Sequence, residues 1–589
     1  MNPHYIFDKE RRIWIKPILA PIAYNDGDEF EEYLAQVIRD ASDVSSSSSE
    51  LLSAIRDWPS EYHLSPVRHN LLSFCRIRAN QSILELGCGC GAITRFLGET
   101  GAQVVGVEGS PRRASIAAER CRDLSNVRIL CDNITNLELQ EKFDFVTLVG
   151  VLEYARLFVE AEDPIVRCLQ IAKSFLNENG VLILAMENQL GLKYFSGATE
   201  DHVGIPYFGV HDLYTQQTAV TFGKKELKDK LDAAEFVAEF IYPFPDYKLP
   251  SVLLTSKSLV HDRFRPCDLL HRAASRDYAG EYPRAFHEQL AWRAIVRNGM
   301  LPDMANSFLV LASTNKNRLE EHTGDWIART FTLGRSHSFS IETIFTTSER
   351  KILVTKNPLR PSLVRDSIEM KNGKLFHEIV DAAEYVEGDL YIVELQLLLG
   401  RDCELDAVKQ WAADWIYLLS NNVISSAQGE LLPGDFLDAT PENYIRSVTG
   451  ELVRIDKEWR FSNPIPFVWV LIRGLVNAIS VSPTSSSLAK LSQKQVIDRV
   501  VADVCKRDLT EQDYLIAADW EDTLRASIFG EPCQYSFNDS LNAPAVSGIS
   551  GPTFAMIIEK HEKEVARIKS TPSWRITAPL RALVNYLKR

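Results

Sequence analysis

Residues 83 to 108 are the stretch that most constrains the fold of this chain. The apolar run ILEL enters the loop Gly87-Cys88-Gly89-Cys90-Gly91, a helical segment follows, and a second apolar run, VVGV, ends at Glu108. This order predicts a strand, a glycine turn, a helix and a second strand. Alternating glycines let the backbone approach a ligand closely and leave N–H groups free at a helix N-terminus. Glu108 is spaced to accept both hydroxyls of a ribose, so the unit is predicted to hold a nucleoside.

The spacing of the glycines distinguishes between classes of nucleoside site. Nicotinamide sites use G-x-G-x-x-G to fit a pyrophosphate, whereas this loop reads E-x-G-x-G-x-G and opens at Glu85. It resembles motif I of the class I S-adenosylmethionine-dependent methyltransferases. The resemblance implies that Glu85, Gly87, Gly89 and Gly91 line the methionine part of S-adenosylmethionine and that Glu108 binds its ribose.

Segments on either side of this loop match the same family. Asp132 follows the strand VRIL, where the family places an acid against the adenine amine. The run from Phe143 to Ala155, which includes Gly150, resembles motif IV with its following loop. Arg68, in the segment before the first strand, is a candidate for binding the cofactor carboxylate, with an ordinary surface arginine as the alternative. For the whole unit, the alternative is a Rossmann-like sheet without a cofactor.

Polar residues gather where the later strands of this unit end. Helix and strand continue to alternate after motif IV, as a doubly wound parallel sheet requires, and reacting groups are expected at the strand ends. Glu153 and Glu187 stand at two such ends, and the next loop carries Glu200-Asp201-His202. We therefore expect an acceptor site there, with His202 or Glu153 as a general base for a hydroxyl acceptor. A surface charge cluster is the alternative for His202.

Composition and charge bound the class of protein. A chain of 589 residues, 45% of them hydrophobic, is expected to be globular and multidomain. Its net charge of −14 argues against nonspecific binding to DNA or RNA, so no nucleic-acid partner is expected. The first residues hold no apolar leader, and the longest apolar run, 467 to 479, is too short to span a bilayer. We expect a cytoplasmic protein whose ten scattered cysteines are free thiols.

A second constellation lies between residues 325 and 460. Three short strands are expected from 325 to 357, and the third ends at Lys356. Asp438 and Asn443 then form D-x-x-x-x-N, and a second aspartate, Asp456, follows thirteen residues later. Phosphoryl transfer needs an acid at the acceptor hydroxyl, oxygen ligands for magnesium and a lysine on the phosphates. Those roles map onto Asp438, onto Asn443 with Asp456, and onto Lys356.

This region resembles the protein-kinase-like fold, nearer to its small-molecule kinases, and the resemblance implies ATP and Mg²⁺ as cofactors. It also departs from that pattern. The catalytic loop reads LPGDFLDATPEN, Asp456 is followed by Lys-Glu-Trp, and the glycine-rich loop near Gly334 is poor. Glu369 is the best available candidate for the glutamate of the kinase αC helix. An inactive kinase-like domain, or a solvated turn before a hairpin, is the alternative.

The end of the chain changes character. Trp574, Ile576 and Leu580 interleave with Arg575 and Arg581, which suits a basic amphipathic segment lying on an anionic membrane or docking on a partner. A terminal helix packed on its own domain is the alternative. The string SWRITAPLR resembles one that recurs in enzymes of bacterial surface-polysaccharide assembly.

The predicted fold class is α/β: a Rossmann-like class I methyltransferase domain, then an α+β kinase-like domain and a C-terminal helical tail. The predicted divisions are an N-terminal extension (1–50), the methyltransferase domain (51–256), a helical linker (257–320), the kinase-like domain (321–535) and the helical, amphipathic tail (551–589).

This domain order resembles the bifunctional enzymes that terminate bacterial O-antigen polymers. The resemblance implies methylation of a glycan terminus or its phosphate in lipopolysaccharide biosynthesis, with a glycan or glycolipid as acceptor. We also expect glycosyltransferases as partners and, through the C-terminal tail, a position on the cytoplasmic face of the inner membrane. Two alternatives stay open: a scaffold with an inactive kinase-like domain that organises glycosyltransferases, and a methyltransferase of a small metabolite.

Overall fold

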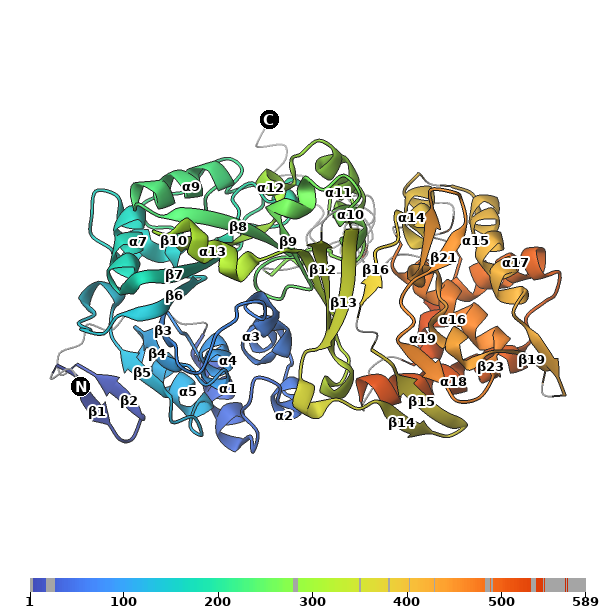
Figure 1. The fold of residues 1–589 in the computed structure, drawn as a ribbon, viewed down its shortest axis with the longest axis horizontal. Coiled ribbons are helices and arrows are strands. Elements are labelled where there is room, and N and C mark those ends of the chain that lie inside the picture. Colours follow the sequence, from blue (N-terminus) through green and yellow to red (C-terminus); the bar gives the residue numbers. More distant parts are fainter. Residues whose placement is uncertain are drawn as a thin grey trace.

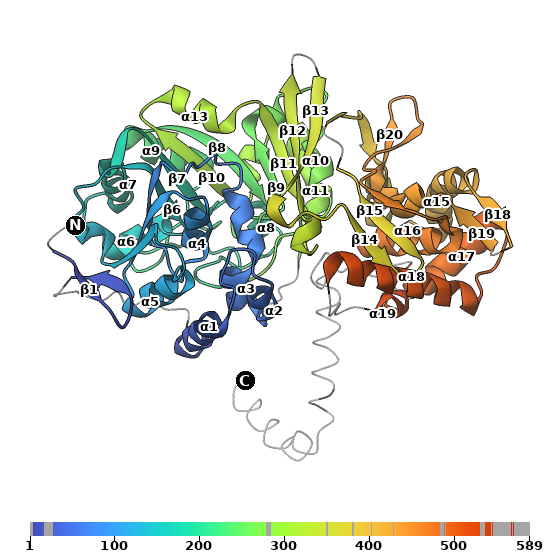
Figure 2. The same ribbon diagram turned by 60° about the horizontal axis from the view of Figure 1, so that its bottom comes forward.

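Two lobes lie along the long axis of the molecule, with antiparallel strands between them (Figures 1 and 2). The computed structural model describes residues 4–16, 27–278, 284–348, 351–379, 382–401, 403–427, 429–482, 491–530 and 536–543, and the single positions 488, 545, 567 and 569. We call residues 4–358, together with the short strand at 383–384, the first lobe, and the rest of residues 361–545 the second lobe. The predicted tail, 551–589, lies outside the described residues apart from two positions.

One mixed sheet forms the backbone of the first lobe. Its strands are, in spatial order, β1 (Ile6–Asp8), β2 (Ile13–Ile15), β5 (Val127–Cys131), β4 (Gln103–Glu108), β3 (Ser82–Leu86), β6 (Phe143–Val149), β7 (Leu176–Glu187), β10 (Ser307–Ser313), β8 (Val237–Phe244), β9 (Val252–Thr255), β11 (Trp326–Phe331), β12 (Ile341–Ser348), β13 (Lys351–Pro358) and β16 (Ala383–Glu384). Neighbours from β2 to β7 pair in parallel, and the remaining pairs are antiparallel. The chain order reverses between β3 and β6, and ligands bind at such switch points in open α/β sheets.

Helices cover both faces of the parallel half, because its strands are apolar on both sides. The helices of the first lobe are α1 (Asp28–Asp40), α2 (Ser49–Ser53), α3 (Trp58–Leu64), α4 (Ala92–Glu99), α5 (Pro111–Arg120), α6 (Ala155–Phe158), α7 (Pro164–Ser174), α8 (Leu192–Phe195), α9 (Lys224–Ala233), α10 (Pro266–Leu269), α11 (Glu288–Arg297), α12 (Leu301–Met304) and α13 (Lys316–Thr323). Local sequence sets where they begin: Asp163 accepts hydrogen bonds from two N–H groups of the first turn of α7, and Pro164 follows it.

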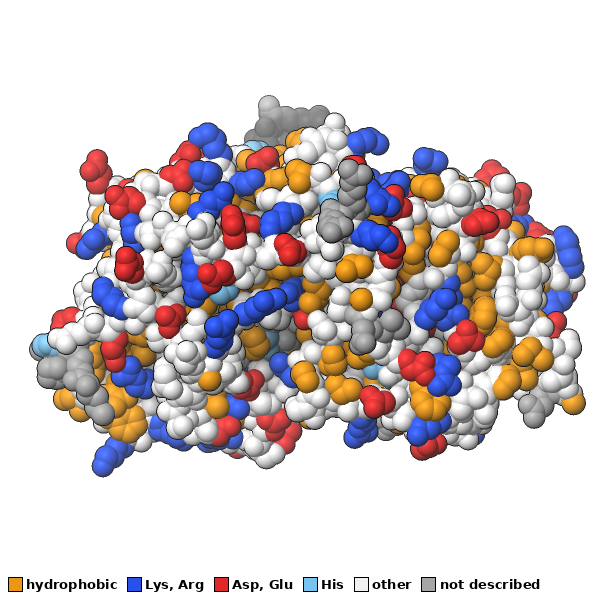
Figure 3. All heavy atoms as spheres, in the orientation of Figure 1, with side chains coloured by type: hydrophobic (Ala, Val, Ile, Leu, Met, Phe, Trp, Pro, Cys, Tyr) orange, Lys and Arg blue, Asp and Glu red, His pale blue; other side chains and the backbone are white. Residues whose placement is uncertain are grey.

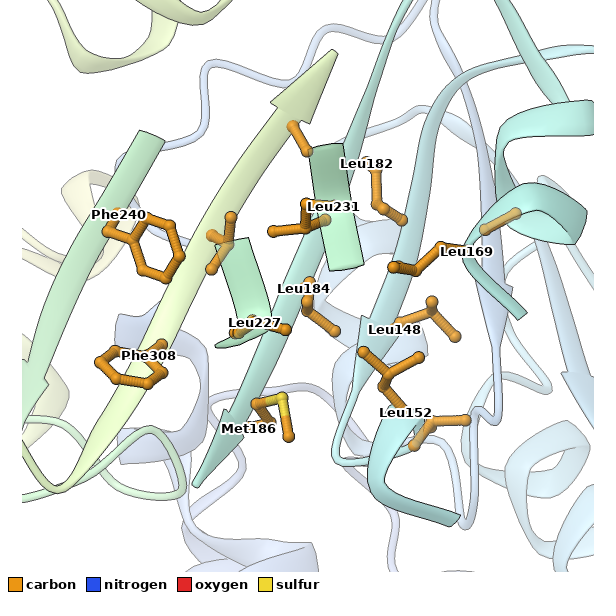
Figure 4. Close-up of a cluster of buried hydrophobic side chains, with 14 of the residues drawn as sticks. Leu148, Leu152, Leu169, Leu182, Leu184, Met186, Leu227, Leu231, Phe240 and Phe308 are labelled. Carbon is orange, nitrogen blue, oxygen red and sulfur yellow. The ribbon is translucent and has the colours of Figure 1, made fainter. Parts of the chain in front are cut away.

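The main core lies between this sheet and the helices α7 and α9. Figure 4 shows Leu169 of α7 with Leu227 and Leu231 of α9 above apolar side chains of β6, β7, β8 and β10. Leu231 is fully buried, and its truncation to alanine would cost about 2–5 kcal/mol. This core fixes the carboxyl ends of β6 and β7, where the predicted acceptor residues stand.

Two segments that were predicted to lie outside the methyltransferase domain form strands of this sheet. Ser307–Ser313 form β10, which pairs with both β7 and β8, so these residues belong to the sheet and not to a helical linker over 257–320. Ile13–Ile15 form β2, which pairs with β5, so part of the predicted extension over 1–50 also belongs to the sheet. All of β10 is buried, whereas in β2 only Ile13 is buried and the other two residues are half-buried. Pairings between such distant segments are not encoded in local sequence patterns.

The second lobe combines small sheets with helices around its own core. The three sheets are β14 (Ser367–Met370) with β15 (Gly373–His377) and β22 (Trp459–Phe461); β17 (Gly388–Leu390) with β20 (Tyr444–Ser447) and β21 (Leu452–Arg454); and β18 (Ile424–Ser426) with β19 (Gly429–Leu432) and β23 (Ile465–Pro466). The helices are α14 (Tyr391–Gly400), α15 (Leu405–Ser420), α16 (Phe467–Ser480), α17 (Gln493–Cys505), α18 (Glu511–Phe529) and α19 (Phe537–Asn542).

The apolar run at 467 to 479 forms α16, most of whose side chains are buried in this core. This burial accounts for the apolar character of the run. Among the described residues, no helix is both long enough and apolar enough to cross a membrane. On the face shown in Figure 3, basic and acidic side chains are interspersed over both lobes.

Candidate active site

A cavity of about 450 Å³ opens at the carboxyl ends of β3, β4 and β6. Its size suits a nucleoside-sized ligand, since small-molecule sites enclose roughly 300–1,000 Å³. It is lined by seven of the eight residues predicted to bind the cofactor: Arg68, Glu85, Gly87, Gly89, Glu108, Asp132 and Gly150. The same cavity extends to Glu153, His202 and Lys248. The structure therefore brings the predicted cofactor and acceptor residues to one site.

Glu108 ends β4, the strand next to β3, and faces the glycine loop that follows β3. One carboxylate oxygen accepts a hydrogen bond from the Gly89 N–H at 2.9 Å, and the other accepts one from the Ser110 N–H at 2.9 Å. These bonds fix the orientation of the carboxylate, which still lines the cavity. A carboxylate oriented in this way can accept hydrogen bonds from the two hydroxyls of a ribose.

Glu85 and Arg68 lie deeper in the cavity wall. Burial raises the pKa of Glu85 to about 8, so its carboxyl group is largely protonated at neutral pH. The Arg68 guanidinium donates to the Lys248 carbonyl at 3.1 Å and to the Tyr62 hydroxyl at 2.8 Å. Arg68 is 4% exposed, so it is not an ordinary surface arginine, and it remains a candidate for binding the cofactor carboxylate.

Asp132 lines the cavity but already has protein partners. The Tyr5 hydroxyl donates to one of its oxygens, Lys16 Nζ lies 3.0 Å from the same oxygen, and the Asn133 N–H donates to the other at 2.8 Å. Tyr5 and Lys16 flank the hairpin β1–β2, so the N-terminal segment contributes to this end of the site.

Gly91 does not line the cavity, and its role is to shape the loop. It precedes α4 with φ at 82°, and a Cβ atom there would lie 2.8 Å from the Ala117 Cα of α5. Any side chain would therefore combine an unfavourable left-handed backbone with a clash against another helix. This glycine is required for close packing of α4 on α5 beneath the loop.

Six ionisable residues gather at the far end of the cavity, and we call them the acceptor-end cluster. Four of them, Glu153, Asp201, His202 and Lys248, line the cavity, and Glu187 and Lys193 contact these residues from behind. Glu153 and Glu187 are fully buried. His202 Nδ1 lies 2.9 Å from the Tyr154 hydroxyl, and its Nε2 lies 3.4 Å from Glu187 Oε2. Burial lowers the pKa of His202, but Glu187 and Glu153 outweigh it and raise the pKa to about 9. The imidazole is therefore charged at neutral pH.

The cluster's acids differ in their partners. Lys248 Nζ lies 2.6 Å from Glu187 and 2.7 Å from Asp201, and Lys193 lies 2.6 Å from Asp201. Burial would raise the pKa of Asp201, but Lys193 and Lys248 lower it below its usual range. Neither oxygen of Glu153 accepts a hydrogen bond from another residue that the structure describes. Burial, and the charge of Glu187, raise the pKa of Glu153 well above its usual range.

Comparison with known proteins identifies the part of the chain that forms this cavity. Residues 84–182 match the family model described as "Methyltransferase domain". These residues are a methyltransferase domain. They include the glycine loop, Glu108, Asp132, Gly150 and Glu153, so the family match and the cavity coincide.

Curated relatives of the methyltransferase domain act on different molecules by name. Pavine N-methyltransferase of Thalictrum flavum subsp. glaucum is 32% identical over 85 residues, which cover 14% of this chain and 24% of the relative. Ubiquinone biosynthesis O-methyltransferase of Bradyrhizobium diazoefficiens is 28% identical over 173 residues, which cover 28% of this chain and 63% of the relative. The chain thus spans less than two thirds of either relative.

Among solved structures, a TehB-like S-adenosylmethionine-dependent methyltransferase from Corynebacterium glutamicum is 14% identical with a TM-score of 0.26. The alignment covers 49% of this chain and 100% of that one. At this TM-score the likeness carries no argument about function.

A second charged cluster lies where β13 faces the second lobe. It consists of Arg335, Lys356, Asp456 and Glu458, which we call the second-lobe cluster. Lys356 Nζ bonds to Asp456 and lies 2.7 Å from Glu458, and Arg335 lies 2.6 Å from Glu458. Burial would raise the pKa of Glu458, but Arg335 and Lys356 lower it below its usual range. The structure thus joins the predicted lysine and aspartate, 100 positions apart in the chain.

The other predicted kinase residues lie close by. Asn443 donates to an Asp438 carboxylate oxygen at 2.9 Å, and Arg473 lies 3.1 Å from the other oxygen of Asp438. The Ile455 N–H donates to the Asn443 carbonyl at 2.8 Å, which holds the D-x-x-x-x-N segment against the residue before Asp456. The three strands predicted over 325–357 are observed as β11, β12 and β13.

The choice of Glu369 as the αC glutamate is wrong. Glu369 lies on strand β14 with its side chain 79% exposed, and its nearby cation is Lys374, at 3.7 Å. Between β13 and β17 the described residues form the hairpin β14–β15 and no α-helix. The partner of Lys356 that the sequence analysis missed is Glu458, two positions after Asp456.

Sequence reasoning also missed much of the acceptor end. Lys248 and Tyr247 enter the cavity from the segment between β8 and β9, and Tyr278 enters from the segment after α10. These residues follow no motif, since their position depends on how loops fold back over the sheet. A lysine and an aspartate set among prolines and aromatic residues in YPFPDYKLP were the available signal.

Proposed function

We propose that this chain binds S-adenosylmethionine in the cavity and transfers its methyl group to an oxygen acceptor held at the acceptor-end cluster. The observation that carries the proposal is the continuity of the cavity. It runs from the glycine loop and Glu108 to Glu153, all within the matched residues 84–182, and continues to His202 beyond them. A cofactor seated on the loop would direct its methyl group toward the buried acids.

Most of the rate would come from positioning, because methyl transfer is an in-line displacement between two bound molecules. A phosphate oxygen needs no base, whereas a hydroxyl must lose its proton. His202 is charged at neutral pH as it lies here, so the ionised form of Glu153 is the better proton acceptor of the two predicted bases. The role of His202 as a base stays a prediction.

The cofactor part of the proposal is tested by calorimetric binding of S-adenosylmethionine. Glu108→Ala is expected to weaken binding about 100-fold, because two charge-assisted hydrogen bonds to the ribose are lost. Glu178→Ala, an exposed glutamate on β7, is the control and is expected to bind normally. Equal binding by both variants and the unchanged chain would refute the placement of the ribose.

For the acceptor we propose a glycan terminus or its phosphate in bacterial O-antigen biosynthesis, presented as a glycolipid at the membrane surface alongside glycosyltransferases. The support is the sequence resemblance in domain order and in the tail. A small metabolite is the second candidate, and the names of the relatives above favour it.

A further candidate function is ATP- and Mg²⁺-dependent phosphoryl transfer in the second lobe. It is favoured by the contact of Lys356 with Asp456, and by Asn443 and Asp438 beside them. A thermal shift with ATP and Mg²⁺ that disappears in Asp456→Ala but persists in Asp519→Ala, a surface aspartate of α18, would support it. No shift in the unchanged chain would favour an inactive scaffold.

Transfer of labelled methyl groups to a membrane glycolipid extract, with ATP present or omitted, separates these candidates. Label that requires ATP would mean that phosphorylation prepares the acceptor. Label without ATP would mean methylation of a glycan hydroxyl. No label in glycolipid, together with S-adenosylmethionine binding, would favour a small metabolite.

A further inference from the structure

Three side chains of the acceptor-end cluster converge from separate segments. Glu153 follows β6, Glu187 ends β7, and His202 lies in the loop after α8. One potential ligand atom from each lies within 4.8 Å of the other two. Glu153 and His202 line the cavity, so this group of side chains borders the space in which an acceptor would lie.

Among the residues that the structure describes, Glu153 is buried without a partner that compensates for the loss of water around its carboxyl group. It is fully buried, and its two oxygens accept no hydrogen bond from another residue within the described part of the chain. A buried carboxyl group without partners costs free energy, and buried acids are normally hydrogen-bonded, ion-paired or bound to a metal. Lys248 does not relieve it, since its ammonium group lies against Glu187 and Asp201.

The other two side chains are held in the orientation that metal ligands need. The Tyr154 hydroxyl engages His202 Nδ1 at 2.9 Å, which turns Nε2 toward the carboxylates. Lys248 engages Glu187 Oε1 at 2.6 Å, which leaves Oε2 on the side of His202. Metal-binding histidines and carboxylates are commonly oriented by a partner on their second atom, and here that partner is a hydrogen bond for His202 and an ion pair for Glu187.

We propose that Glu153, Glu187 and His202 hold a divalent cation of the Mn²⁺ type, which binds the acceptor through two adjacent oxygens. The proposal rests on the proposed methyl transfer for its substrate class, a vicinal diol. Two carboxylates and one imidazole suit such a cation, and an octahedral ion would keep three further positions for the diol and one water molecule.

The cation would change the chemistry of the acceptor. A hydroxyl bound to it gives up its proton more readily, and the proton leaves to water in the open cavity. The acceptor oxygen then forms a bond to the methyl carbon while the S–CH₃ bond of the sulfonium breaks. The sulfur keeps that electron pair and becomes a neutral thioether. Glu153 acts as a ligand in this step, and no side-chain base is needed.

Binding is tested on the full chain with Mn²⁺ alone, by calorimetry and electron paramagnetic resonance. Glu153→Gln is expected to weaken binding at this site at least about tenfold, and Glu160→Gln, an exposed glutamate on the same loop, is the matched control. Asp456→Asn is included to remove any binding in the second lobe. Labelling of histidine with ¹⁵N should alter the Mn²⁺ resonance signal of the unchanged chain, because His202 is a ligand of the proposed site. Mn²⁺ bound by Asn443 and Asp456 in the second lobe would not show this change, because neither residue carries an imidazole.

Activity assays distinguish failure of the metal site from failure of the proposed methyl transfer. Methyl transfer to a vicinal diol, assayed without ATP, should fall at least about tenfold in EDTA and return with Mn²⁺. Undiminished transfer in EDTA, or Mn²⁺ binding that is insensitive to Glu153→Gln and to the histidine label, would overturn the metal site and leave methyl transfer intact. Loss of S-adenosylmethionine binding would instead indicate a misfolded variant, so each variant is first titrated with that cofactor.

Discussion

The acceptor-end cluster and the second-lobe cluster both combine buried carboxyl groups with basic side chains, and they differ in how far their charges are compensated. In the second-lobe cluster, Glu458 lies against both Lys356 and Arg335, and Asp456 bonds to Lys356. In the acceptor-end cluster, Lys248 and Lys193 form ion pairs with Glu187 and Asp201. Glu153 faces the cavity and has no hydrogen-bond partner among the described residues. A ligand can therefore enter the first cluster directly, whereas in the second it must displace ion pairs.

The largest expected effect is a difference in the free energy of unfolding between one variant of each cluster. Glu458→Gln should destabilise the second lobe by about 3–5 kcal/mol, because it leaves Lys356 and Arg335 buried with less compensation. Glu153→Gln in the metal-free chain should change stability by less than about 1 kcal/mol, since its raised pKa already keeps the carboxyl protonated. Hydrogen exchange resolved by peptide measures both. A large loss in Glu153→Gln would show that Glu153 has a stabilising partner.

The pH dependence of the free energy of unfolding tests the ion pairs of the second-lobe cluster. The pKa of Glu458 is lowered in the folded chain, so its contribution to stability is fully present above its unfolded pKa of about 4.5 and is lost as the pH falls below that value. The deficit of Glu458→Gln should therefore be constant from pH 5 to 7 and shrink on acidification. Denaturant unfolding at several pH values checks this, and a deficit that grew at low pH would contradict the ion pairs.

A smaller difference in stability is expected between glycine substitutions in one backbone turn of each lobe. Gly91→Ala should cost about 2–3 kcal/mol and weaken cofactor binding, because left-handed strain adds to the clash with Ala117. Gly450→Ala has a similar φ of 87° but meets no atom within 4 Å, so it should cost about 1 kcal/mol. Thermal unfolding with and without S-adenosylmethionine distinguishes them. Equal costs would mean that α4 can shift away from α5.

Local sequence was sufficient for the features that depend on neighbouring residues. The glycine loop, the strand that ends at Glu108, the strands over 325–357 and the buried helix α16 all follow from hydrophobic runs and turn residues. The meeting of Lys356 with Asp456 was also anticipated, from a spacing typical of phosphoryl-transfer sites.

Features that depend on long-range packing could not be anticipated. The insertion of β10 between β7 and β8 is decided by which apolar strand fits an open edge, and the sequence of Ser307–Ser313 does not specify its neighbours. The same holds for Lys248, whose role arises because a loop returns over the cavity to Glu187. The prediction that Glu369 is the αC glutamate was wrong because it needs a helix where Ser367–Met370 pair as a strand.

The pairing of β11 with both β9 and β12 makes the first lobe mechanically continuous up to Lys356. If the lobes rotate, the bend must fall in the segments that leave β13 and β16, so Lys356 travels with the glycine loop while Asp456 travels with the other body. The ion pair of Lys356 with Asp456 would have to break in such a rotation, together with the ion pairs of Arg263, Arg265 and Arg272 with Glu387, Asp389 and Glu442.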